Sequence, residues 1–235
     1  NADALAVLID EPSPFRDARD PGFREPTATD ILEWLKRAGE QRPDILLLDY
    51  GRFVDRRKHS LESDPERKPL RKRAQRCLLV AAGGNEGAAS DERGTVPALF
   101  PEVLAVGPLR ADGRLQPYAS RHPDLGKPDV FMEDQLEATA LAQALNHDAL
   151  RLLDPAGERE ETAGSSFAAL HAVAAAVLVW SLLPQLSPRG IKRFLVQATT
   201  PVEGEGSGWA RRLKLGEVVA FARRRVVENA LAGGP

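Results

Sequence analysis

The stretch Thr162–Leu183, TAGSSFAALHAVAAAVLVWSLL, determines how the rest of the chain must be arranged. From Phe167 onward it is hydrophobic on every face, and a helix of that composition lies inside a core rather than on a surface. Pro184 and Pro188 then end the helix. The sequence therefore predicts one central helix around which other elements must pack.

Two serines, Ser165 and Ser166, stand where this helix would begin. The free N–H groups and the positive dipole end of a helix N-terminus stabilise negative charge, so a serine there can be a cap or a nucleophile. A membrane span is a third interpretation. It is disfavoured because the run of about 17 residues is at the short limit for crossing a bilayer and contains His171 and many alanines.

The composition is typical of a single globular domain over residues 1–235, with 43% hydrophobic and 28% charged residues. The net charge of -2 gives no argument for a nucleic acid or membrane partner, and the basic clusters Arg71–Arg76 and Arg223–Arg225 are expected to be solvated helix faces. The single cysteine, Cys77, excludes an internal disulfide framework and is compatible with a cytoplasmic location. Removal of a targeting segment would leave an extracytoplasmic location open as the alternative.

Short apolar runs alternate with helical patterns along the chain. Four of them are predicted to be buried strands, at Ala4–Asp10, Pro43–Tyr50, Cys77–Ala82 and Val103–Val106. Helices are predicted at Asp30–Glu40 with Thr27 or Thr29 as cap, Pro188–Ala198 with Ser187 as cap, and Leu215–Ala230; Leu61–Gln75 is compatible with a helix, and Ala140–Leu153 with a hairpin or short helix. This order predicts a mostly parallel sheet.

Polar residues follow two of the predicted strands directly, where an open parallel sheet places its working site. Asn85 follows one strand through Gly83 and Gly84, and Tyr50 with Gly51 follows another. An asparagine side chain is a neutral hydrogen-bond donor, the kind of group that stabilises the oxyanion formed when a serine attacks a carbonyl. Taken alone, Gly-Gly-Asn is also typical of a simple turn.

Considered together, these segments resemble the subtilisin-like serine peptidases, the subtilases. Gly164–His171, GSSFAALH, is similar to their serine motif GTSMASPH, although Leu170 stands where the family has proline. Leu78–Gly87, LLVAAGGNEG, is similar to their oxyanion segment VVVAAAGNEG. Four more segments resemble family motifs in the same order along the chain: Ile31–Leu35, Asp44–Gly51, Pro101–Gly107 and Lys127–Val130.

The resemblance implies a three-layer α/β sandwich with a mostly parallel central sheet, incomplete at its N-terminal part, and the activity of a serine endopeptidase. It implies that Ser166 is the nucleophile, that Ser165 takes the place of the family's threonine, and that Asn85 stabilises the oxyanion. No metal ligands are assigned and no cofactor is expected, and a structural calcium ion is not readable from the sequence.

The resemblance also implies a specificity cleft with two walls of backbone. Tyr50 and Gly51 would pair with the substrate along one wall, and the opposite wall would be formed by Ala82, Gly83 and Gly84. Glu86, with Asp49 close by, would add negative charge near this pocket and favour a basic or polar residue before the scissile bond.

The aspartate and histidine motifs of the subtilases, D-[ST]-G and HGTHVAG, are not found. His171 matches a non-catalytic histidine of the family's serine helix. His59 and His122 fall in polar loops or at helix edges, and His147 has no supporting motif. Asp10 lies in a strand-like run, but only about 20 residues separate it from the helix at Ile31, which leaves no room for a histidine segment. We therefore expect the chain to begin after the family's histidine.

A serine without a base is a poor nucleophile, so two interpretations remain. In the first, an N-terminal partner chain or fragment carrying the Asp and His motifs completes a processed, two-chain peptidase that acts on peptides or proteins. In the second, this is a degenerate subtilase fold used for binding or scaffolding, in which Ser166 survives as a helix cap. The intact GSS and GGN elements favour the first. An unrelated doubly wound domain would need a phosphate-binding glycine loop, which the sequence lacks.

Overall fold

The computed structural model of this chain describes residues 27–87, 93–134, 164–205 and 208–231. The strand predicted at Ala4–Asp10 and the ambiguous segment Ala140–Leu153, which includes His147, lie outside the described residues.

A six-stranded sheet forms the centre of the fold, in the order β1-β3-β5-β6-β8-β7. Neighbouring strands are parallel except for β7, which is antiparallel to β8. The strands are β1 (Ile45–Leu48), β3 (Leu78–Ala82), β5 (Leu104–Leu109), β6 (Val130–Glu133), β7 (Thr200–Pro201) and β8 (Arg211–Arg212). A separate antiparallel pair joins β2 (Arg52–Asp55) to β4 (Arg93–Val96). The mostly parallel sheet predicted from the sequence is confirmed.

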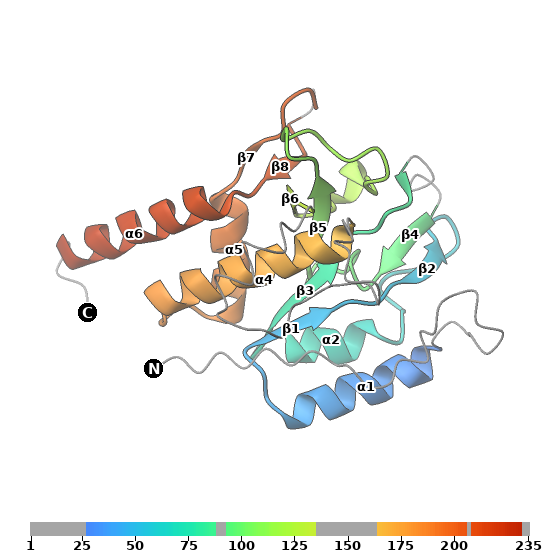
Figure 1. Cartoon of the computed structure of the whole chain (residues 1–235). Coiled ribbons are helices and arrows are strands. Elements are labelled where there is room, and N and C mark those ends of the chain that lie inside the picture. Colours follow the sequence, from blue (N-terminus) through green and yellow to red (C-terminus); the bar gives the residue numbers. More distant parts are fainter. Residues whose placement is uncertain (1–26, 88–92, 135–163, 206–207, 232–235) are drawn as a thin grey trace, which may run out of the picture.

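Helices cover both faces of the sheet, which makes three layers (Figure 1). The alternation of side chains along β1 shows why both faces need a cover, because Ile45 belongs to one apolar cluster while Leu46 and Leu48 belong to the other. One face carries α1 (Ala28–Glu40) and α2 (Arg67–Arg73), and the other carries α4 (Ser165–Leu182), α5 (Pro188–Gln197) and α6 (Leu215–Leu231). A short 3-10 helix, η2 (Pro123–Leu125), precedes β6.

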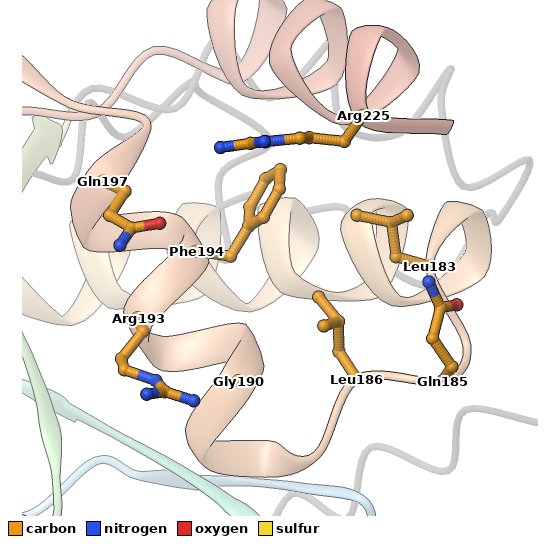
Figure 2. Close-up of a pocket in the computed structure, with 8 residues that line it drawn as sticks. All are labelled: Leu183, Gln185, Leu186, Gly190, Arg193, Phe194, Gln197 and Arg225. Atoms are coloured by element: carbon orange, nitrogen blue, oxygen red, sulfur yellow. The ribbon is translucent and has the colours of Figure 1, made fainter. Parts of the chain in front are cut away.

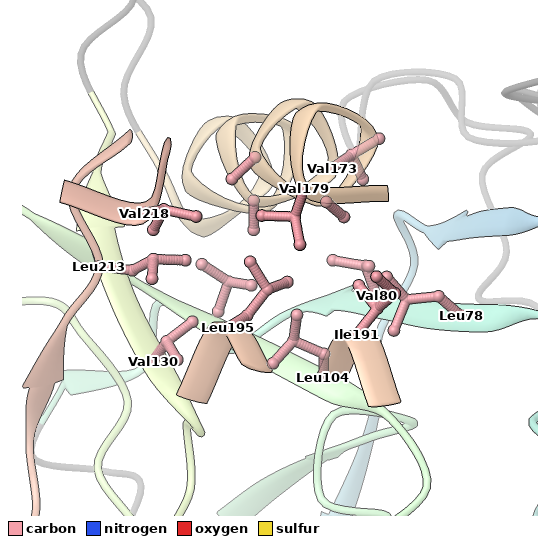
Figure 3. Packing of buried hydrophobic residues seen from close by; sticks show 14 of the residues in the cluster. Leu78, Val80, Leu104, Val130, Val173, Val179, Ile191, Leu195, Leu213 and Val218 are labelled. Atoms are coloured by element: carbon pink, nitrogen blue, oxygen red, sulfur yellow. The ribbon is translucent and has the colours of Figure 1, made fainter. Parts of the chain in front are cut away.

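Helix α4 is the central helix predicted from the sequence. Its small residues Ala168, Ala169, Ala172, Ala175 and Ala176 are fully buried, which lets the helix lie close to the sheet. Figure 3 shows side chains of α4 and α5 meeting those of the strands in a single apolar cluster. Among the described helices, α4 alone is long and apolar enough to cross a membrane, and its packing against the sheet is that of the core helix of a globular fold.

The predicted helix starts are largely confirmed. Thr27 caps α1, because its Oγ1 accepts a hydrogen bond from the Asp30 N–H at 3.3 Å while the Asp30 carboxylate accepts one from the Thr27 N–H at 2.8 Å. Ser187 caps α5 by accepting a hydrogen bond from the Gly190 N–H at 3.1 Å. Helix α2 is shorter than the helix-compatible stretch Leu61–Gln75, because Asp64 and Glu66 turn inward to pair with other side chains before the helix begins.

Candidate active site

The two motifs singled out in the sequence meet in space. The Ser165 N–H donates to Asn85 Oδ1 at 3.0 Å, and the Gly84 N–H donates to Ser165 Oγ at 3.3 Å. Asn85 lies just beyond the end of β3, and its side chain is exposed. Because the oxygen of the amide is already engaged, the Nδ2 end is the donor that remains for a ligand.

The start of α4 depends on Gly164. This residue is the N-cap, and its φ is +149°, a backbone conformation that residues other than glycine rarely adopt. The interpretation of Ser166 or Ser165 as the N-cap is therefore wrong. Gly164 has no side chain, so no side chain caps this helix. Both serines instead lie in the first turn, where the helix leaves N–H groups without an intrahelical acceptor and where negative charge is favoured.

The backbone between β3 and Asn85 leaves no room for side chains. A Cβ on Gly84, which has φ +105°, would lie 2.3 Å from Glu86 Oε2 and 2.6 Å from Ser120 Oγ. A Cβ on Gly83 would lie 2.8 Å from the carbonyl oxygen of Val106. The two glycines therefore present bare backbone beside the half-buried Ala82 that ends β3.

Glu86 is held by two hydroxyl groups. Its carboxylate accepts hydrogen bonds from Ser120 Oγ and, at 3.3 Å, from Thr95 Oγ1, while its own N–H donates to Ser120 Oγ at 3.1 Å. The methyl group of Thr95 would be 2.4 Å from a Cβ on Gly51. The carboxylate therefore lies between the Gly84 backbone and the segment that contains Gly51.

The Tyr50 side chain is anchored to Glu66. Its hydroxyl donates to Glu66 Oε2 at 3.1 Å, and burial together with the Glu66 charge raises the pKa of the Tyr50 phenol well above its usual value. Glu66 also accepts from Arg52 Nε at 2.8 Å, so the residues on both sides of Gly51 are anchored to one carboxylate. Asp49 is exposed beyond the end of β1.

Two histidines of the described chain are engaged in other contacts. His171 Nδ1 lies 2.7 Å from the Glu133 carbonyl oxygen, which agrees with its expected structural role. His59 Nε2 lies 2.7 Å from the buried Asp64 carboxylate. His122, which the sequence placed in a polar loop or at a helix edge, is 1% exposed and belongs to the interior. The described residues contain no group of three or more His, Cys, Asp and Glu side chains arranged to hold a metal ion.

Sequence reasoning missed two residues of this site, Thr95 and Ser120. Each reaches Glu86 only because β4 and the turn before η2 are folded next to the loop after β3. No motif in the sequence marks either residue, so only the fold reveals them.

The arrangement of a serine-bearing core helix beside an asparagine at the end of a parallel strand has a counterpart in known families. The sequence matches the model of the Subtilase family over residues 20–216. This chain belongs to the subtilase family. Its sheet and flanking helices are accordingly those of a subtilisin-like α/β fold, as the sequence predicted.

Solved structures of subtilisin-like proteases share this fold at low sequence identity. The patellamide maturation protease PatA has a TM-score of 0.63 and 19% identity, with 86% of this chain and 71% of that chain covered. The prenylagaramide maturation protease PagA has a TM-score of 0.63 and 19% identity, with 84% and 68% covered. The nisin leader peptidase NisP from Lactococcus lactis has a TM-score of 0.60 and 16% identity, with 82% and 62% covered.

Proposed function

We propose that this subtilase chain supplies the nucleophile and the oxyanion donor of a serine endopeptidase, and that a segment bearing the family's Asp and His motifs completes the site. Ser166 attacks the scissile carbonyl, a histidine of the completing segment accepts its proton, and Asn85 Nδ2 donates to the oxyanion. This segment is a separate chain or a fragment cut from the N-terminal side.

The bond between the Ser165 N–H and Asn85 Oδ1, at 3.0 Å, carries this proposal. It joins the two motifs across 80 residues of sequence and turns the amide so that Nδ2 is the free donor. A preorganised donor of this kind contributes to catalysis because it needs no reorientation when the negative charge forms. A fold kept only for scaffolding gains nothing from such a donor.

The second candidate is a pseudoprotease that binds a partner through the same fold. The contacts of His171 with Glu133 and of His59 with Asp64 favour it, because both histidines already have other roles. The exposed Asn85 and the Gly-Gly backbone beside it favour the peptidase, since neither is needed to stabilise a scaffold.

We further propose that the substrate is an extended peptide held between two segments of backbone. Tyr50 and Gly51 form one wall, and Ala82, Gly83 and Gly84 form the other. The Glu86 carboxylate, positioned by Thr95 and Ser120, lies between them and, with Asp49 nearby, selects a basic or polar residue before the scissile bond.

A fluorophosphonate probe tests the proposed activity in material assembled with the Asp/His-bearing segment. We expect labelling at Ser166 that is lost in Ser166→Ala and retained in Ser181→Ala, a matched change at an exposed serine of the same helix. Intact-mass analysis under denaturing conditions identifies the completing segment. Labelling at another residue, or none in assembled material, would support the pseudoprotease.

A peptide library tests the proposed specificity. We expect cleavage after basic or polar residues, and Glu86→Gln should reduce the preference for basic residues while leaving cleavage after neutral residues in place. A preference that does not change in Glu86→Gln would exclude this carboxylate as the selecting group.

A further inference from the structure

A cavity lies at the opposite end of α4 from the serines. It has a volume of about 260 Å³ and opens between the end of α4, one face of α5 and α6. Figure 2 shows Phe194 pointing into it, with Leu183 and Leu186 on one side and Arg225 above them in this view. Leu183 and Phe194 are largely buried, so the floor of the cavity is apolar and fixed by the core.

The edge of this cavity is positively charged. Arg193 of α5 and Arg225 of α6 both line it, and no aspartate or glutamate is among its lining residues. Within the described chain, Arg193 forms no ion pair, whereas Arg225 pairs with Glu228 at 3.2 Å in a position where both side chains are more than half exposed. An exposed pair of this kind is weak and is readily exchanged for another anion.

The cavity is separate from the candidate active site. Ser166 and Leu183 lie at the two ends of α4, and the rise of an α-helix places residues 17 positions apart about 25 Å from each other. A ligand in the cavity therefore touches neither Ser166 nor Asn85. The class of ligand must therefore be inferred from the residues that line the cavity. These form an apolar floor, with guanidinium groups and the amides of Gln185 and Gln197 at the rim.

We propose that this cavity binds an apolar residue that carries a free carboxylate, as presented by the C-terminus of a peptide. The side chain of that residue packs on Phe194, Leu183 and Leu186, and its carboxylate is held by the arginines at the edge. Guanidinium groups suit this role because they bind carboxylates through two parallel hydrogen bonds. A volume of about 260 Å³ accommodates one such residue rather than a long segment. A free apolar carboxylic acid offers the same chemistry.

Binding of short peptides to the full chain tests this proposal by calorimetry or NMR titration. The probes are acetyl-Gly-Gly-Leu with a free carboxylate, the same peptide as its C-terminal amide, and hexanoate. We expect the amide to bind at least tenfold more weakly than the acid, since the uncharged amide does not form the charge-assisted hydrogen bonds that a carboxylate forms with guanidinium groups. If the acid peptide binds more tightly than hexanoate, the source is a peptide terminus; equal binding assigns a free acid.

Variants at the cavity edge provide the control. Arg193→Gln and Arg225→Gln should each weaken binding of the acid peptide about tenfold. Arg224→Gln, a neighbouring exposed arginine outside the lining, should leave it unchanged. Equal affinity for acid and amide, no binding of either, or an equal loss in Arg224→Gln would overturn the proposal. All titrations are repeated in Ser166→Ala, so the result does not depend on whether the chain is a peptidase.

Discussion

Lys127 joins the residue before β5 to the residue before β6, and its titration offers a quantitative test of this connection. It is 4% exposed, and its Nζ donates to the Val103 carbonyl oxygen at 2.7 Å and to Asp129 Oδ2 at 2.6 Å. Lys192 approaches the same carboxylate, with its Nζ 3.1 Å from Asp129 Oδ1. Burial, opposed by Asp129 and reinforced by the Lys192 charge, lowers the pKa of Lys127 from 10.5 to about 8.

The sign of the resulting pH dependence follows from linkage. Between pH 8 and 10.5 the unfolded chain holds the Lys127 proton and the folded chain does not, so the free energy of unfolding rises with pH in this window. A difference of about 2.5 pKa units corresponds to roughly 3 kcal/mol, of which about half is gained by pH 9. This contribution is lost again as the pH falls through 8.

Urea unfolding of the wild type and of Lys127→Met, measured in parallel from pH 7 to 10.5, tests this reasoning. The comparison removes the effects of distant groups that titrate in the same range, because those are shared by both proteins. We expect the stability difference to shift in favour of the wild type as the pH rises. Parallel curves for the two proteins would refute the argument, since they would mean that the lysine keeps its ordinary pKa when buried. In Lys192→Met the lower edge of this window should move to higher pH, because the neighbouring positive charge is gone, while its upper edge at the unfolded pKa stays in place, so the window narrows.

Two further substitutions test other parts of the fold. Glu66→Ala removes the buried carboxylate that accepts from both Tyr50 and Arg52, and the loss of unfolding free energy should be about 3 to 5 kcal/mol, measured by chemical denaturation; a loss below 1 kcal/mol would show that this network does not hold the Gly51 segment. Ser187→Ala removes the cap of α5 and should cost about 1 kcal/mol, seen as a lower melting temperature, whereas Ser181→Ala on the exposed side of α4 should leave it nearly unchanged.

Hydrophobic pattern was sufficient to predict most of the elements that make up the core, although not β6. The strands β1, β3 and β5 and the helices α1, α4, α5 and α6 each bury an apolar stripe or face, and each was predicted close to its observed position. The strand β2 was not predicted, because only Val54 is buried in Arg52–Asp55 and Phe53 is 50% exposed. The strands β7 and β8 have two residues each, too few to show any period.

The residues of the candidate site that belong to recognisable motifs were predicted. The residues that only the fold brings to the site were missed. Ser166 and Asn85 came from recognisable motifs, and the structure brings their segments together. The inward turn of Asp64 and Glu66 could not be foreseen, because both lie in a highly charged run that is typical of a solvated surface. Their burial depends on ion pairs with Arg52 from another segment, and a sequence pattern does not indicate which distant residues will pair.

The bond between Ser165 and Asn85 also bears on how the chain reaches its native state. It closes a loop of 80 residues, and the pairing of Phe131 with Arg212 closes another of similar length. Contacts of such long range incur their loop-closure entropy before they contribute any stabilisation, and folds that depend on them form slowly. A nascent or partly folded chain therefore has its serine but not yet Asn85 beside it. Under the proposed function, reactivity of Ser166 toward a fluorophosphonate would require completed folding of this chain as well as assembly with the Asp/His-bearing segment.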